Sequence, residues 1–168
     1  GQRFSEADLA AALGRRRAVV NCSGLGARTQ VADDSLQPIR GQIVRVSPGL
    51  APRFLQAADD PRVVSYIIPR PDCTVLGGTT EPGEWSLEAD PAVTEAILAR
   101  CRALVPALTA AQVLSVAVGL RPGRPSVRLE AEHRDGRLLV HNYGHGGAGL
   151  TLSRGCATAV EALIAAAG

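Results

Sequence analysis

Residues 138–151 read Leu-Leu-Val-His-Asn-Tyr-Gly-His-Gly-Gly-Ala-Gly-Leu-Thr, and this stretch says most about the fold. Its apolar start predicts a strand, four of the six positions from 144 to 149 are glycine, and residues 152–167 then predict a helix. A strand, a glycine loop and a helix in this order direct free backbone N–H groups and a helix N-terminus at an anion. We therefore expect a cofactor at this loop, with a purely structural turn as the alternative.

The same loop contains the pattern G-x-G-x-x-G at Gly144, Gly146 and Gly149. In dinucleotide-binding folds this pattern opens a β-α-β unit, whose second strand ends in an acidic residue about 20 residues later. Here the residues after Gly149 predict one helix and no second strand. A nicotinamide-binding module would need that β-α-β unit, so the context argues against it.

The composition is that of a globular protein. The chain has 168 residues, of which 46 % are hydrophobic, and its net charge of +2 gives no reason to expect a nucleic-acid partner. All 18 basic residues are arginine, which is typical of a GC-rich bacterial genome. The chain lacks methionine, so we expect that Gly1 is not a native start. We see no secretion signal and no apolar run near the ~20 residues of a membrane span, and we expect a cytoplasmic protein without a membrane partner.

Cysteine and histidine spacing gives no metal site. No C-x-x-C pattern occurs, and buried, reduced thiols are the expected state of all four cysteines: Cys22, Cys73, Cys101 and Cys156. His141 and His145 lack a third ligand nearby, so we expect them to bond to backbone in a tight loop and not to hold a metal.

Local signals predict a mixed α/β (α+β) protein with about seven strands and three or four helices. One helix should run from the capping box at Ser5 to about Gly14, and a second from Asp90-Pro91 to near Pro106. Residues 134–137 should form a hairpin turn through Asp-Gly. The expected strands are 18–21, 41–46, 63–68, 74–76, 113–120, 127–131 and 138–142. The first is so short that it should join a sheet built by other strands.

Six motifs carry a family resemblance. They are Val-Val-Asn-Cys-Ser-Gly (19–24), Leu-Gln-Pro-Ile-Arg-Gly-Gln-Ile-Val-Arg-Val (36–46), Tyr-Ile-Ile-Pro (66–69), Leu-Gly-Gly with Gly-Glu-Trp (76–78, 83–85), Gly-Leu-Arg-Pro-Gly-Arg-Pro-Ser-Val-Arg-Leu-Glu (119–130), and His-Asn-Tyr-Gly-His-Gly-Gly-Ala-Gly-Leu-Thr (141–151). In order and approximate spacing the chain resembles the C-terminal half of a D-amino-acid oxidase, the flavoenzyme family that includes D-aspartate oxidase.

The resemblance implies a two-domain FAD oxidoreductase of which this chain is one half. Residues 1–40 and 121–168 would be strand and helix pieces of a Rossmann-like FAD domain, and 41–120 the mixed sheet of the substrate-binding domain. The β-α-β unit that cradles the FAD pyrophosphate would belong to an N-terminal half, either of the same polypeptide or on a separate chain, and a homo-oligomer is a further option. The implied reaction transfers hydride from the α-carbon of a D-amino acid to flavin, yielding a 2-oxo acid, ammonia and, with O2, hydrogen peroxide.

The resemblance also assigns substrate residues. Arg121 would bind the α-carboxylate through its two-pronged guanidinium, and Tyr66 would donate its hydroxyl to the same carboxylate. Gly147 would place its carbonyl against the amine. Without the family motif, Arg121 could be a surface residue in a turn at a strand end, and Tyr66 a packed strand residue. A second tyrosine of eukaryotic members corresponds to Arg62, in a shorter segment, so we expect a more open pocket.

Apart from Arg128, the flavin residues implied by the resemblance lie in the small-residue turn Cys22–Gly26 and in the glycine loop with the start of the helix after it. The loop would bring backbone N–H groups and a hydroxyl to the pyrimidine edge of the flavin, and Arg128 would lie close to it. The full set is Cys22, Ser23, Gly24, Arg128, Gly146, Gly147, Gly149, Leu150 and Thr151.

Two positions separate the members of the family. The D-aspartate branch has a serine where this chain has Gly147 and an arginine where it has Gln56, so we expect neutral D-amino acids as substrates. D-Aspartate oxidase is the rival within the class. A non-catalytic fragment unable to hold FAD alone is the rival of another class, and it would be colourless.

Overall fold

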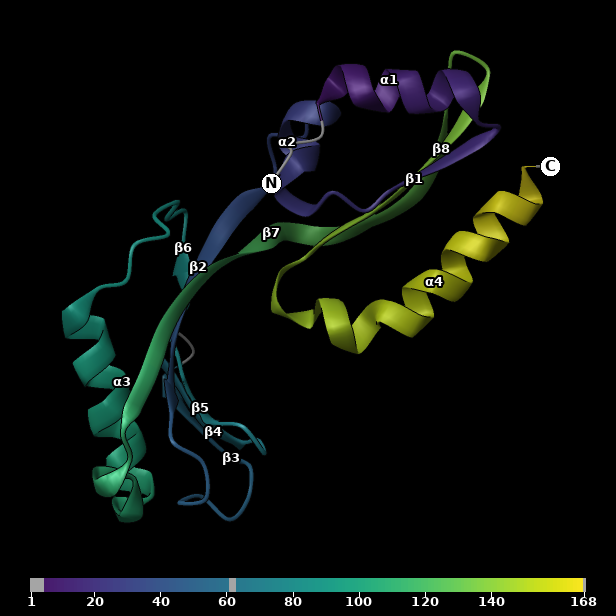
Figure 1. Cartoon of the computed structure of the whole chain (residues 1–168). Helices are drawn as coiled ribbons and strands as arrows, with labels where there is room; N and C mark the ends of the chain where they lie inside the picture. The colour runs from purple at the N-terminus through teal and green to yellow at the C-terminus, as the bar shows by residue number, and fades with distance from the viewer. Residues whose placement is uncertain (1–4, 61–62, 168) are drawn as a thin grey trace. The chain divides into compact units, whose positions relative to one another are not determined.

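The computed structural model describes residues 5–60 and 63–167, which divide into two compact units (Figure 1). The first unit comprises Gly1–Pro38 and Arg121–Gly168, and the second comprises Ile39–Leu120. The helices are α1 (Glu6–Arg15), α2 (Ala27–Gln30), α3 (Pro91–Leu104) and α4 (Gly149–Ala166), and three short 3-10 helices are η1 (Gly24–Gly26), η2 (Pro106–Ala110) and η3 (Gly146–Ala148). The strands are β1 (Ala18–Asn21), β2 (Gln37–Val46), β3 (Leu55–Asp60), β4 (Val63–Pro69), β5 (Thr74–Gly77), β6 (Glu81–Pro82), β7 (Val113–Arg134) and β8 (Arg137–His145).

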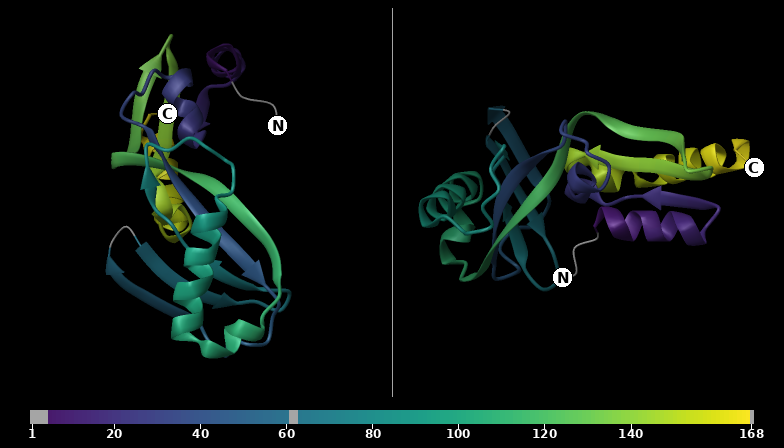
Figure 2. Two further views of the ribbon diagram at one scale, coloured as in Figure 1. Left: turned by 90° about the vertical axis from the view of Figure 1, so that its left-hand side faces the viewer. Right: turned by 90° about the horizontal axis from the view of Figure 1, so that it is seen from above.

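In the first unit, two helices cover opposite faces of the strand pair β1–β8 (Figures 1 and 2). The short strand β1 runs parallel to β8, as expected of a strand that joins others, and β8 pairs antiparallel with β7. Side chains alternate along β8. Leu139 therefore packs against Leu9 and Leu13 of α1, while Leu138 and Val140 pack against Val160 of α4.

In the second unit, α3 lies along one face of an antiparallel sheet (Figure 2, left). Strand β5 pairs with both β2 and β4, and β4 pairs with β3. The side chains of Ile97, Leu98 and Cys101 from α3 are buried against the sheet. The helix begins as its sequence predicts, because the Asp90 carboxylate accepts a hydrogen bond from the Ala92 N–H (2.7 Å) and Pro91 occupies the first helical position.

The mixed α/β class is confirmed, and the elements differ from expectation in three places. Strand β3 and the short β6 were not expected, and the polar stretch after Gly26 contains α2. The segments 113–120 and 127–131 are not separate strands but parts of the single strand β7. Its pairing with β8 shifts register between Gly123 and Arg128, and this interval contains Pro125, which a bulge accommodates.

Within the described residues no helix is both long and apolar enough to cross a membrane.

Candidate functional site

The candidate site lies where the chain leaves two parallel strands. Because β1 and β8 are parallel, with Asn21 opposite His141, their carboxyl ends point to the same edge of the sheet. Strand β1 leads into Cys22–Gly26, and β8 leads into the glycine loop and α4. Ligands of open α/β sheets bind outside the carboxyl ends of parallel strands. The two turns named in the sequence analysis are therefore at the edge where such a ligand is expected.

Asn21 shapes the first turn. Its buried side-chain oxygen accepts hydrogen bonds from the backbone N–H (3.1 Å) and the hydroxyl (2.6 Å) of Ser23. Gly24 follows with a φ of +57°, in the left-handed region that favours glycine. Cys22 is exposed in this turn, so the expectation of a buried thiol is wrong for Cys22, although it holds for the other three cysteines.

Arg121 and Pro122 lie beside both turns. A Cβ added to Gly24 would lie 3.6 Å from Cγ of Pro122, and one added to Gly147 would lie 3.8 Å from Cδ of Arg121. Arg121 is interior to β7 and not at a strand end as expected, because the strand continues from Val113 to Arg134. The structure thus brings together three segments that are far apart in the sequence.

The glycine loop needs glycine for two reasons at Gly144. Its φ is +85°, and a Cβ there would lie only 2.9 Å from Cβ of Arg124. Gly146 also has a positive φ, +54°. The loop can therefore make its turn and let Arg124 approach only without side chains at these positions.

The first turn of α4 is open to a ligand. Ala148 at the N-cap makes no side-chain cap hydrogen bond, so the N–H groups of the first turn lack a capping oxygen. Gly147 and Thr151 are exposed, and the apolar side chain of Leu150 is 90 % exposed. Uncapped N–H groups and the helix dipole favour an anionic or electron-rich partner here.

A buried polar cluster holds the bulge of β7 against β8. One oxygen of Asp33 accepts hydrogen bonds from Nε of Arg124 (3.0 Å) and from the hydroxyl of Tyr143 (2.9 Å), and Nη1 of Arg128 donates to that hydroxyl (2.8 Å). Burial would raise the pKa of Asp33, but hydrogen bonds from Ser35 and Tyr143 and the charge of Arg124 outweigh it and lower the pKa to about 2. Asp33 is therefore ionised at neutral pH.

Arg128 is engaged in this cluster. Besides Tyr143, its Nε lies 2.6 Å from Glu130 Oε1 and its Nη2 lies 3.5 Å from Glu132 Oε2. These contacts give it a structural role, and its proximity to a flavin stays a prediction. Sequence reasoning missed Asp33 and Tyr143. The Asp-x-Ser turn at 33–35 can be recognised from the sequence, but contacts with partners about a hundred positions away cannot.

The two histidines have different surroundings. The ring of His141 is buried on β8, and neither of its nitrogens makes a hydrogen bond within the described residues, so the expected backbone bond is wrong for His141. Burial and the nearby Arg128 lower its pKa, although Glu132, 3.5 Å away, acts in the opposite direction. Nε2 of His145 lies 3.4 Å from the thiol of Cys156. Within the described residues no three potential ligands gather around a metal position.

Tyr66 and Gln56 belong to the second unit and are direct neighbours there. In the register of the sheet, Gln56 on β3 lies opposite Tyr66 on β4, and Tyr66 lies opposite Gly77 on β5. Residues directly opposite one another share a face of the sheet. Arg62, the position of the second family tyrosine, lies outside the described residues.

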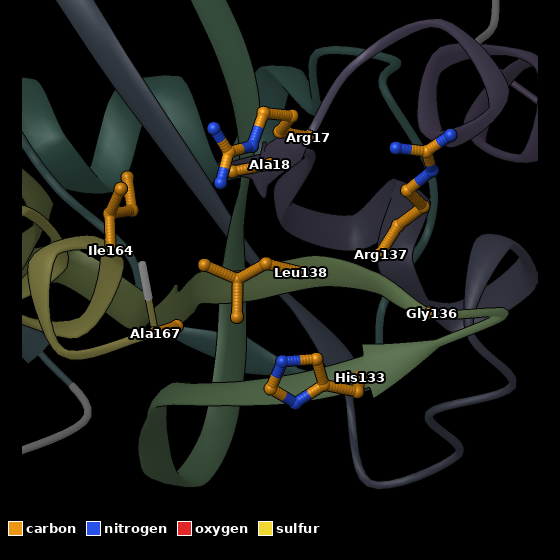
Figure 3. Close-up of a pocket in the computed structure, with 8 residues that line it drawn as sticks. All are labelled: Arg17, Ala18, His133, Gly136, Arg137, Leu138, Ile164 and Ala167. Carbon is orange, nitrogen blue, oxygen red and sulfur yellow. The ribbon is translucent and has the colours of Figure 1, made fainter.

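A pocket of about 470 Å³ in the first unit lies elsewhere (Figure 3). It is lined by Arg17, His133, Arg137 and Leu138 among others, so it sits at the start of β8, whereas the glycine loop follows the end of that strand. No residue of the expected substrate or flavin site lines it.

Comparison with known proteins agrees with this geometry. Residues 3–163 match the family described as FAD dependent oxidoreductase, and the chain belongs to that family. Within it, the chain is 57 % identical to a D-amino-acid oxidase of Rubrobacter xylanophilus over 151 residues. This alignment covers 89 % of the chain and 46 % of that protein. A D-amino-acid oxidase of Streptomyces coelicolor is 52 % identical, over 83 % of the chain and 44 % of its own length. The resemblance seen in the motifs is thereby confirmed.

More distant relatives have other substrates in their names. A human D-aspartate oxidase is 43 % identical over 86 % of the chain and 42 % of its own length. Among solved structures, a glycine oxidase from Geobacillus kaustophilus has a TM-score of 0.74 at 26 % identity, covering 88 % of the chain and 41 % of that protein. The chain thus spans less than half the length of the curated relatives it matches.

Proposed function

We propose that the chain is part of an enzyme that oxidises neutral D-amino acids with FAD and O2, giving 2-oxo acids, ammonia and hydrogen peroxide. The observation that carries the proposal is the placement of Arg121 beside Gly147 and the Cys22–Gly26 turn, at the carboxyl ends of β1 and β8. Two D-amino-acid oxidases at 57 % and 52 % identity support the same activity.

The residues of the first unit fit a flavin. The exposed glycine loop lets backbone approach a flat ring, the uncapped start of α4 favours the electron-rich edge of a reduced flavin, and Leu150 offers apolar contact. FAD, when bound, accepts the hydride. The chain's own contribution is to hold the substrate in the orientation that the transfer requires.

Arg121 has the chemistry for the substrate carboxylate. A guanidinium is permanently charged and donates two parallel hydrogen bonds to a carboxylate. The adjacent carbonyl of Gly147 would accept a hydrogen bond from the amine, so the two groups would fix both polar substituents of the α-carbon. Tyr66 would add a hydrogen bond to the carboxylate.

The preference for neutral substrates rests on Gln56 and Gly147. Gln56 is the cross-strand neighbour of Tyr66 and carries no charge, so it offers no ion pair to a side-chain carboxylate. D-Aspartate oxidase activity is the alternative, supported by the 43 % identical human relative.

We further propose that additional sequence of the same enzyme, on the same or a separate polypeptide, packs against β1 and α4. Strand β1 is the last strand in the sheet order of the described residues, and Val20 on it is 38 % exposed. Helix α4 exposes Leu150, Leu152 and Ile164. An open strand edge beside exposed apolar side chains is typical of an interface, and the relatives have the length to supply it. A cytoplasmic location stays a prediction.

The test is purification of the complete protein that carries this chain. We expect a yellow protein with flavin absorbance that forms peroxide with D-alanine and not with L-alanine, with a higher kcat/KM for D-alanine than for D-aspartate. A colourless complete protein would refute the cofactor assignment, and a preference for D-aspartate would support the alternative.

A further inference from the structure

The side chain of Tyr66 occupies space that only a glycine at position 77 leaves open. The two residues are directly opposite in the antiparallel pair β4–β5. If Gly77 carried a Cβ, the three nearest atoms would be Cζ, Cε2 and the hydroxyl oxygen of Tyr66, all in severe overlap with it. The tyrosine ring therefore lies directly over the backbone of Gly77. A Cβ at Gly78 would also lie close to the ring, 3.1 Å from the hydroxyl oxygen.

The backbone under the ring is held by contacts of its own. The N–H of Gly78 donates to the carbonyl of Val64 (2.6 Å), and Nη2 of Arg100 donates to the carbonyl of Gly78 (3.4 Å). The buried thiol of Cys101 lies 4.0 Å from the carbonyl oxygen of Gly77. These contacts leave the backbone little room to retreat, so a side chain at position 77 would move the tyrosine ring and not the strand.

We propose that the Gly77–Gly78 pair is a positioning element that sets the place of the Tyr66 hydroxyl, and through it the affinity for the substrate carboxylate. The proposal rests on the proposed function, in which Tyr66 binds that carboxylate. Gly77 itself touches no substrate in this scheme. It acts by letting the ring lie flat on the strand, so that the hydroxyl reaches one position only.

A purely structural role is the competing explanation. An aromatic ring over a cross-strand glycine stabilises a sheet by packing alone. In that case a Gly77→Ala variant would lose stability and leave substrate affinity unchanged in the folded fraction. The two explanations differ in whether KM responds.

The experiment is Gly77→Ala in the complete protein, with Gly14→Ala as the matched control. A Cβ at Gly14 meets no atom within 4 Å, and that position has no positive φ. Removing a hydrogen bond to a charged group costs roughly tenfold or more in affinity. We expect KM for D-alanine to rise about tenfold or more in Gly77→Ala, with kcat within about twofold and flavin content unchanged, because binding common to ground state and transition state is lost. The control should match the wild type.

Two further measurements keep the proposal testable. In a Tyr66→Phe background, which lacks the hydroxyl, Gly77→Ala should raise KM no further. Independently of activity, the 19F resonance of 3-fluorotyrosine at position 66, assigned with Tyr66→Phe, should shift in Gly77→Ala and stay in place in Gly14→Ala. An unchanged KM, additive effects in the double variant, or an unmoved resonance would each overturn the proposal. A wild-type protein without oxidase activity would instead refute the proposed function. The 19F resonance would still show whether Gly77 sets the position of the Tyr66 ring.

Discussion

Replacing Asp33 with asparagine should destabilise the protein in a pH-dependent way. The buried carboxylate accepts hydrogen bonds from Ser35, Arg124 and Tyr143, and it has a pKa of about 2 against 3.8 for the unperturbed group. A pKa lowered by about 1.8 corresponds to about 2.4 kcal/mol of stability, at about 1.4 kcal/mol for each pKa unit. Arg124 and Arg128 would also lose their buried counter-charge, so we expect Asp33→Asn to cost at least about 2 kcal/mol at pH 7.

The direction in which stability changes with pH follows from the lowered pKa of Asp33. Because the folded-state pKa lies below the unfolded one, the stabilisation is complete above about pH 5 and is lost as the pH falls through 3.8 towards 2. The asparagine variant lacks this titration. The difference in unfolding free energy between wild type and variant should therefore narrow by about 1 kcal/mol between pH 7 and pH 3.

Urea unfolding of the complete protein at pH 7, 5 and 3, followed by circular dichroism, measures this difference. Asp72→Asn is the control, because the Asp72 side chain is 74 % exposed and a change there should stay within about 0.5 kcal/mol. A gap between wild type and Asp33→Asn that is the same at pH 7 and pH 3 would refute the reasoning about this cluster.

Three further outcomes are expected from the site. Arg121→Lys should keep flavin but lower kcat/KM more than about thirtyfold, because the charge remains while the two-pronged contact is lost. That contact contributes at least ~2 kcal/mol to transition-state binding. Near-wild-type kinetics would show that Arg121 does not bind the substrate. Gln56→Arg should raise kcat/KM for D-aspartate relative to D-alanine by supplying a cation beside Tyr66, and an unchanged ratio would place Gln56 away from the substrate side chain. Gly144→Ala should lower the free energy of unfolding by about 1–3 kcal/mol, because φ is +85° there and the new Cβ would meet Arg124. Gly155→Ala is the control, because a Cβ there meets open space and should not destabilise the protein. Equal stabilities of the two variants in thermal unfolding would contradict this prediction.

Local signals were sufficient where a residue acts on its own neighbours. Asp90-Pro91 marked the start of α3, Asp-Gly marked the turn between β7 and β8, and the apolar run before the glycines marked β8. The glycine loop was predicted as a cofactor loop from its strand–glycine–helix pattern, and the role of Arg121 was implied by the family resemblance.

Other features could not be predicted because they depend on partners distant in sequence. Strand β3 has the sequence LQAADD, which has no β-branched or aromatic residue, and it forms because β4 pairs with it. Strand β7 continues past Pro125 because its pairing with β8 shifts register between Gly123 and Arg128. The Asp33 cluster joins residues up to 110 positions apart. In each case tertiary pairing outweighs local preference.

The way the two units alternate along the chain bears on the order of events during synthesis. Ile39–Leu120 is one uninterrupted segment with its own buried core, so it can fold as soon as it has left the ribosome. Strand β1, by contrast, pairs with residues 138–141, which are made about 6–24 s later at ~5–20 residues per second. During that interval Val19 and Val20 cannot pair with β8. The candidate site joins segments about 120 residues apart, so it can form only after residues 138–149 have been made.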